Sequence, residues 1–269
     1  MKEPTNKIEL VATVVCVSII VALAGCATTT ATRAAQPQPT SGAPTTAGGY
    51  RTFLPDRPGP HPALVFLSGC SGLTPSVAPH AYERVAEQLR AQGYLVIFAD
   101  YLSRRGLASC TGAPITHADA AQDLVAAADW LKAQPSVDPT RITAMGWSYG
   151  GGAVLVALAT YAGERLAFSR AVTYYPDCRA VRPWTNPMPV LMLLAGDDDV
   201  APSTRCQEAA RQSATPAAVK IVVYPGARHG FDASELPAKL TYPLGTLGYH
   251  PQAAAAAWDE VQRFLPPAK

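Results

Sequence analysis

The segment RITAMGWSYGGGAVLVALATYA, residues 141–162, joins a strand-like apolar run to a helix-like run through a turn rich in glycine. Ser148 stands at the centre of this turn, in the pattern G-x-S-x-G. Between a strand and a helix this pattern is typical of a nucleophile elbow, where a tight turn pushes the serine hydroxyl outward and nearby side chains would clash. The pattern alone also fits a plain glycine-rich bend between packed elements, so the rest of the chain must decide.

Short apolar runs, each typical of a buried strand, alternate with segments of helical periodicity along the rest of the chain. The strand-like runs are residues 63–69, 94–100, 141–147, 170–176, 189–196 and 219–226. The helix-like segments are residues 82–93, 117–134, 151–162 and 253–265. Such alternation predicts one α/β domain with a mostly parallel central sheet and helices on both faces.

The N-terminus has the features of an export signal. Lys2 and Lys7 precede an apolar run over residues 10–26, which is short for a membrane span and ends in small residues. Its end, Leu-Ala-Gly-Cys, resembles a bacterial lipobox and predicts lipidation of Cys26; a retained N-terminal anchor is the alternative. Ala27 favours sorting to the periplasmic side of the outer membrane.

The sequence therefore predicts three parts. They are a lipoprotein signal peptide over residues 1–26, a flexible tether over 27–49 and the folded domain over 50–269. The tether is rich in Thr, Ala and Pro and nearly uncharged. The formal net charge of the 269-residue chain is +2, and its Lys and Arg residues are scattered. We therefore expect a membrane-tethered protein with no nucleic-acid partner.

Side chains suited to nucleophilic catalysis follow the predicted strands. They are Ser148, the run Asp197 to Asp199, and His229. Because ligands of such sheets bind beyond the carboxyl ends of the strands, these side chains are expected at one edge. Their order along the chain, Ser then acid then His, is that of α/β-hydrolases, which favours Ser148 as a nucleophile and His229 as its base.

Five segments together resemble the dienelactone hydrolase family of α/β-hydrolases. They are LSGCSGL (67–73), FADYLSRRG (98–106), GWSYGGG (146–152), PVLMLLAGDDDVAPSTRC (189–206) and VVYPGARHGFD (222–232). The resemblance covers roughly residues 50–265. It implies the α/β-hydrolase fold and hydrolysis of a small-molecule ester or lactone without a cofactor. No cluster of residues has metal-ligand spacing.

The chain departs from the founding members of that family in two places. Ser148 stands where they carry a cysteine nucleophile, and Ser68 and Gly69 stand where they carry a His-Glu pair. Both departures favour a more general esterase over activity on dienelactone itself. The alternatives are a thioesterase or polyester hydrolase with the same three residues, and a non-catalytic binding lipoprotein.

Three aspartates compete for the role of the acid. Asp198 is flanked by Pro189 and Pro202 at the family's P-x8-D-x3-P spacing, so we assign the role to it. Asp199 remains the alternative because it follows Gly196 at a common glycine-to-acid spacing. Asp197 is expected to be a solvated loop residue.

Beyond the signal and the lipobox, four cysteines remain, an even number in an exported protein. Three pairings are open, and the sequence does not choose among them. The family resemblance implies that the oxyanion hole consists of the backbone amides of Cys70 and Tyr149. We hypothesise a Cys70–Cys110 disulfide that stiffens the oxyanion loop, and a Cys178–Cys206 disulfide that braces the segment carrying the acid.

Other substrate contacts are expected from Arg104 and Arg105, which could meet a carboxylate as an arginine of this region does in the family, and from Trp147. A solvated basic pair and plain aromatic packing are the alternatives. The remaining histidines are expected at the surface or as helix caps. They are His61, His80, His117 and His250. The loops near residues 71–80, 101–116 and 232–250 are expected to shape the pocket.

Overall fold

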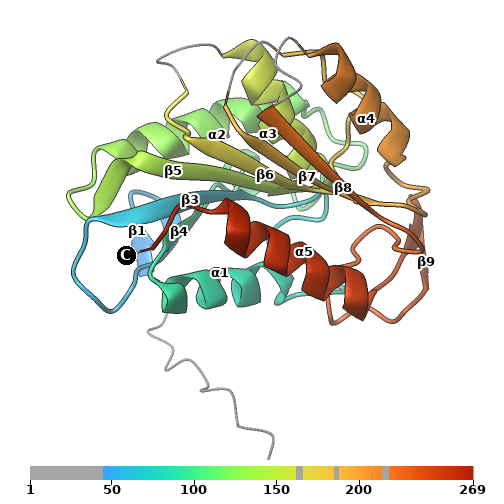
Figure 1. Ribbon diagram of the computed structural model, residues 1–269, viewed down its shortest axis with the longest axis horizontal. Helices are drawn as coiled ribbons and strands as arrows, with labels where there is room; N and C mark the ends of the chain where they lie inside the picture. Colours follow the sequence, from blue (N-terminus) through green and yellow to red (C-terminus); the bar gives the residue numbers. More distant parts are fainter. Residues whose placement is uncertain (1–44, 162–165, 185–187, 214–217, 269) are drawn as a thin grey trace, which may run out of the picture. The chain divides into compact units, whose positions relative to one another are not determined.

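The computed structural model describes residues 45–161, 166–184, 188–213 and 218–268 (Figure 1). The predicted lipid site Cys26, the predicted signal peptide and most of the predicted tether lie outside these residues. Within the described part of the chain, no helix is both long and apolar enough to cross a membrane.

The central sheet has eight strands in the order β1-β2-β4-β3-β5-β6-β7-β8. The strands are β1 (Thr45–Ala47), β2 (Tyr50–Phe53), β3 (His61–Leu67), β4 (Leu95–Phe98), β5 (Val137–Trp147), β6 (Arg170–Tyr174), β7 (Val190–Ala195) and β8 (Val219–Tyr224). From β4 to β8 all neighbours pair in parallel, whereas β1 and β2 add an antiparallel edge. The predicted mostly parallel sheet is confirmed.

Helices cover both faces of this sheet (Figure 1). One face carries α1 (Ala81–Gln92) and α5 (Pro251–Phe264). The other carries α2 (His117–Lys132), α3 (Ser148–Thr160) and α4 (Ser203–Gln212). Alternate residues of a strand point to opposite faces. In the fully buried strand β3, Val65 and Leu67 therefore pack in the core under α2 and α3, while Leu64 and Phe66 pack in the core under α1 and α5.

Several short elements were not predicted. Strand β1 lies inside the expected tether and pairs with β2, so the sheet begins five residues before the expected domain boundary. A two-stranded hairpin, β9 (Leu240–Tyr242) and β10 (Gly245–Leu247), lies outside the main sheet. Strands of three or four residues are too short to show a period, and their place is decided by pairing with distant segments.

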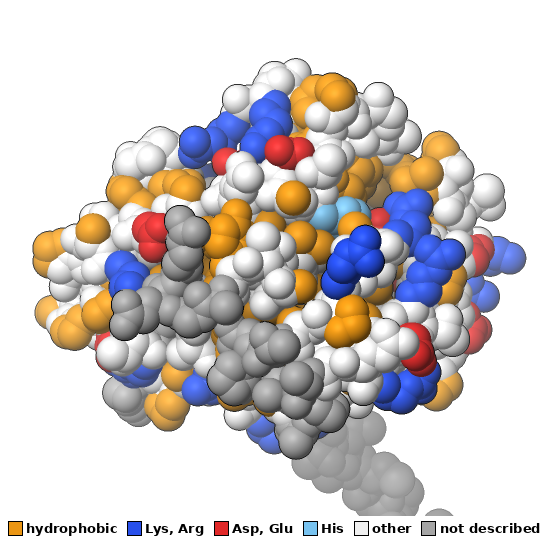
Figure 2. All heavy atoms as spheres, turned by 90° about the horizontal axis from the view of Figure 1, so that it is seen from above, with side chains coloured by type: hydrophobic (Ala, Val, Ile, Leu, Met, Phe, Trp, Pro, Cys, Tyr) orange, Lys and Arg blue, Asp and Glu red, His pale blue; other side chains and the backbone are white. Residues whose placement is uncertain are grey.

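The surface that Figure 2 shows carries no single block of charge. Lys and Arg side chains lie scattered among hydrophobic and uncharged ones on this face.

Candidate active site

Ser148 lies at the junction of β5 and α3, with a left-handed backbone (φ 51°) that non-glycine residues rarely adopt. Two glycines make this turn possible. A Cβ on Gly146 would lie 2.6 Å from the carbonyl oxygen of Gly150, and a Cβ on Gly150 would lie 2.3 Å from that of Ser68. The segment is thus a strained strand–turn–helix elbow, and the plain-bend interpretation does not describe it.

Ser148, His229 and Asp198 form one hydrogen-bonded chain. The Ser148 Oγ atom lies 2.8 Å from His229 Nε2, and His229 Nδ1 lies 2.8 Å from Asp198 Oδ2. The other carboxylate oxygen of Asp198 accepts bonds from the backbone amides of Val200 (2.9 Å) and Ala201 (2.7 Å). These bonds fix the carboxylate, which can accept from Nδ1–H and leave Nε2 free to accept from the serine hydroxyl.

Asp199, the alternative acid, lies elsewhere. Its carboxylate accepts bonds from the backbone amide (2.7 Å) and the hydroxyl (2.9 Å) of Thr246. These bonds hold the pKa of Asp199 below its ordinary value. Asp197 is exposed, as expected of a loop residue. Of the three aspartates, the structure brings Asp198 to His229.

The loop after β3 is fixed beside the elbow by several polar contacts. The backbone amide of Gly69 donates to the hydroxyl of Tyr82 (2.9 Å), and the hydroxyl of Tyr101 donates to the Gly69 carbonyl (3.0 Å). Cys70 follows, and its carbonyl accepts from the amide of Cys110 (2.9 Å). A Cβ on Gly69 would lie 3.3 Å from the Cβ of Ser148, so the loop approaches the serine closely.

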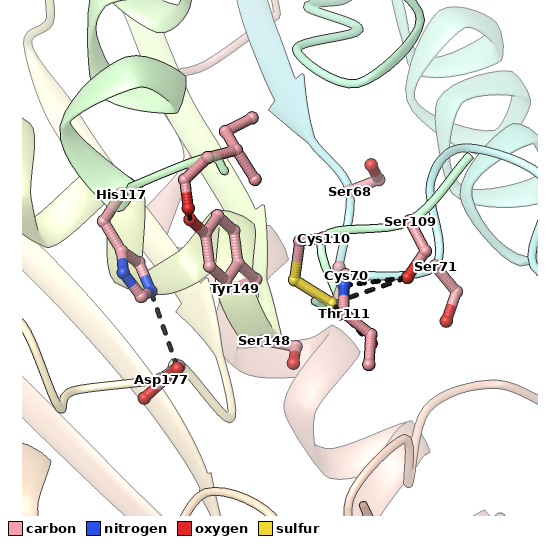
Figure 3. The surroundings of a disulfide bond; sticks show 12 residues. Ser68, Cys70, Ser71, Ser109, Cys110, Thr111, His117, Ser148, Tyr149 and Asp177 are labelled. Carbon is pink, nitrogen blue, oxygen red and sulfur yellow. Dashed lines mark hydrogen bonds and ion pairs between the residues drawn. A yellow bond between two sulfur atoms is a disulfide. The ribbon is translucent and has the colours of Figure 1, made fainter. Parts of the chain in front are cut away.

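Both expected disulfides are present. Cys70 is bonded to Cys110, and Figure 3 shows this bridge beside Ser148 and Tyr149. Cys178 is bonded to Cys206 and joins the loop after β6 to α4. Disulfides are typical of proteins that fold in an oxidising compartment outside the cytosol.

Ser148 and His229 line a cleft with a volume of about 100 Å³. Its walls are mostly apolar and come from the segments before α1 and after His229, which include two of the three loops expected to shape the pocket. The apolar lining residues are Pro75, Val77, Ala78, Ala81, Val200, Ala233, Leu236, Leu244 and Leu247. Trp147 is among the residues that border the cleft, but its side chain is only 1% exposed, so its role as a substrate contact stays a prediction.

Arg104 and Arg105 lie away from this cleft. They form the short 3-10 helix η1 (Ser103–Arg105) and pair with Asp123 of α2, with 3.6 Å between Arg104 Nε and the carboxylate. Neither lines the cleft, so the solvated basic pair describes their position better than a substrate contact does.

Asp232 was not predicted as a site residue. One carboxylate oxygen accepts from Trp147 Nε1 (2.8 Å), and the other accepts from the hydroxyl of Tyr175 (2.6 Å). The Tyr175 ring in turn packs 4.6 Å from the His229 ring. Loss of water contact raises the pKa of Asp232, an effect that these two hydrogen bonds oppose. In the sequence, only its position three residues after His229 indicated that Asp232 lies near the active site.

Two histidines expected at the surface are buried. His61 lies in β3, and His117 begins α2, where its ring stacks on Tyr149 with 4.0 Å between centroids. His117 Nε2 lies 3.6 Å from the Asp177 carboxylate (Figure 3). Burial lowers the pKa of His117. His250 accepts a bond from the Ala253 amide and caps α5 as expected.

Within the described ranges, no three His, Cys, Asp or Glu side chains come together in a way that could hold a metal ion.

A search of curated proteins finds distant relatives. An uncharacterized protein of Mycobacterium tuberculosis is 31% identical over 191 residues, which span 64% of this chain and 64% of that protein. A 59-residue segment is 42% identical to a dipeptidyl-aminopeptidase B-like protein of Metarhizium robertsii and covers 22% of this chain and 6% of that protein. The matches thus span less than two thirds of each relative.

Solved structures share the fold. A Klebsiella pneumoniae protein classed as a dienelactone hydrolase superposes with a TM-score of 0.63 at 20% identity, over 82% of this chain and 95% of that one. A dienelactone hydrolase-like promiscuous phosphotriesterase from metagenomic libraries superposes with a TM-score of 0.60 at 21% identity, over 77% of this chain and 86% of that one. An esterase of Thermogutta terrifontis superposes with a TM-score of 0.57 at 16% identity, over 82% of this chain and 89% of that one.

The model of the dienelactone hydrolase family matches residues 49–268, which is most of the chain and all of the sheet beyond β1. The sequence resemblance is thereby confirmed, together with the α/β-hydrolase fold that it implied. The chain belongs to the dienelactone hydrolase family.

Proposed function

We propose that this protein is a serine hydrolase that cleaves carboxylic esters or lactones, with Ser148 as nucleophile, His229 as general base and acid, and Asp198 as the acid that orients the imidazole. The observation that carries the proposal is the continuous hydrogen-bonded chain from Ser148 through His229 to Asp198, with 2.8 Å at each link. It lies in an apolar cleft, where an uncharged ester can bind.

In the proposed reaction, His229 Nε2 takes the proton of Ser148 as Oγ attacks the substrate carbonyl. Asp198 stabilises the imidazolium that forms. His229 then gives the proton to the departing alcohol, and water hydrolyses the acyl-enzyme by the same two steps. The low exposure of the His229 and Asp198 side chains strengthens their attraction during these steps.

The backbone amides of Cys70 and Tyr149 are the proposed oxyanion hole. Tyr149 is in the first turn of α3, where backbone N–H groups have no acceptor within the helix. Cys70 lines the cleft and lies in the loop that Tyr82 and the disulfide fix. Each donor of an oxyanion hole contributes about 3 kcal/mol to transition-state stabilisation.

The purified domain should hydrolyse p-nitrophenyl butyrate and become labelled by a fluorophosphonate probe at one serine. Peptide mass spectrometry of the labelled protein should place the probe on Ser148. A protein that neither turns over short-chain esters nor reacts with the probe would instead be the non-catalytic binding lipoprotein.

We further propose that Cys26 carries the lipid that anchors the protein to a membrane, on the periplasmic side of the outer membrane. The lipobox-like end of the apolar N-terminal run and the two disulfides support this location. Cys26→Ser should move the protein from the membrane fraction or leave it unprocessed, as seen by fractionation and intact mass. A wild-type protein whose intact mass shows the full-length N-terminus and no added lipid would favour the retained anchor.

A further inference from the structure

The β9–β10 hairpin is joined to two of the segments that carry the active site. The Gly248 amide donates to the carbonyl of His229 (3.0 Å), and Leu247 forms a bridge with the same residue. On the other side, the hydroxyl of Tyr242 lies 3.1 Å from the Ser71 hydroxyl, next to the proposed oxyanion residue Cys70. The hairpin therefore spans the cleft from the histidine to the oxyanion loop.

A third connection runs to the segment that carries Asp198. Asp199 binds both the amide and the hydroxyl of Thr246 on β10. The approach is so close that a Cβ on Gly245 would lie 2.6 Å from the Asp199 carboxylate and 2.8 Å from Val200. Gly245 has a φ of 145°, in the region that favours glycine. The position of the hairpin is thus fixed by the residue next to the proposed acid.

The tip of this hairpin presents an apolar side chain to water. Leu244 is 47% exposed and lines the cleft. Among the described residues, the only other exposed large hydrophobic side chains are those of Leu54 and Val223. Neither of these two lines the cleft. The cleft is also lined by Leu236 and Leu247, which belong to a small apolar cluster. An exposed leucine that continues an apolar cleft marks a surface for an apolar ligand.

The position of His229 indicates which part of an ester would occupy this surface. When the acyl-enzyme forms, Ser148 Oγ bonds to the carbonyl carbon, the bond from that carbon to the alcohol oxygen breaks, and His229 Nε2 gives its proton to that oxygen. The alcohol must therefore leave past His229. The hairpin follows His229 in the chain, pairs with it through Leu247, and lines the cleft through Tyr242, Leu244 and Leu247.

We propose that the β9–β10 hairpin, with Leu244 at its tip, is the binding surface for the alcohol portion of the substrate, and that the preferred substrates are esters of apolar alkyl alcohols. This proposal rests on the proposed ester hydrolysis by Ser148. Each methylene of the alkyl chain that leaves water against the hairpin should strengthen binding about fourfold.

The test compares ethyl, butyl and hexyl acetate, with acid release followed by pH-stat titration. The kcat/KM of the wild-type protein should rise with alcohol length. In Leu244→Ala, the ratio of kcat/KM for hexyl acetate to that for ethyl acetate should fall about three- to tenfold. Because the ratio is taken within one variant, a smaller folded fraction cancels.

Leu54→Ala is the matched control, since Leu54 is 48% exposed and does not line the cleft. It should keep the wild-type ratio. An active protein whose ratio is unchanged in Leu244→Ala would overturn the proposal while leaving ester hydrolysis intact. The proposal would also be overturned if Leu244→Ala changed kcat/KM only along a series that varies the acyl group, namely ethyl acetate, ethyl butyrate and ethyl hexanoate. A wild-type protein inert on all these esters would overturn both proposals.

Discussion

Replacing Ser148 by alanine should lower kcat/KM for p-nitrophenyl butyrate by about 10⁵-fold, because no other group can form the acyl-enzyme at this position. The Ser148 hydroxyl is the one that His229 Nε2 meets at 2.8 Å. Initial rates at a series of substrate concentrations, with the active fraction of the wild type titrated by a fluorophosphonate, would measure the loss. Labelling of the variant should disappear in parallel.

Ser103→Ala provides the comparison, since Ser103 is an exposed residue of η1 outside the cleft. Its turnover should stay within about twofold of the wild type. Circular dichroism and thermal unfolding of both variants would show that the fold is kept. If Ser148→Ala retained more than about one per cent of the wild-type rate, hydrolysis would proceed without the proposed nucleophile.

Replacing Asp198 by asparagine should lower kcat/KM by about 10³- to 10⁴-fold with little change in KM. The backbone amides of Val200 and Ala201 both donate to Oδ1 of Asp198 and would hold the side-chain oxygen of the asparagine in the same place. Its amide nitrogen would then face His229 Nδ1. That nitrogen donates, so Nδ1 would become the acceptor and Nε2 would carry the proton, in the tautomer that cannot accept from Ser148.

The same change at Asp199 separates the two candidate acids. Asp199→Asn removes charge from the contact with Thr246 but leaves His229 and Asp198 in place. Its loss of kcat/KM on ethyl acetate should be below about tenfold, at least a hundred times smaller than that of Asp198→Asn. Equal losses in the two variants would contradict the assignment of Asp198.

The parts of the molecule that were predictable from the sequence are those that local chemistry decides. The elbow around Ser148 has a glycine pattern that follows from steric contact within a few residues, and the central strands are continuous apolar runs. Asp198 could be separated from Asp199 only through the flanking prolines, and the structure brings Asp198 to His229.

The remaining features depend on contacts between distant segments. The contacts of Asp232 become visible only when Trp147, at the end of β5, and Tyr175, directly after β6, converge on it. The hairpin has three residues in each strand, and its place depends on the bonds from Asp199 to Thr246. Arg104 and Arg105 were singled out by their place after a strand, but the carboxylate of Asp123 on α2 binds them away from the cleft.

The Cys70–Cys110 disulfide has two effects. It closes a loop with a sequence separation of 40, which in the chain-entropy model stabilises the folded state by about 4 kcal/mol. The same bond immobilises the residue proposed to bind the oxyanion. Formation of this one disulfide would therefore both stabilise the fold and position the proposed oxyanion donor. A copy of the chain kept in a reducing compartment would have the complete amino-acid sequence of the enzyme, yet its oxyanion loop would be held by hydrogen bonds alone.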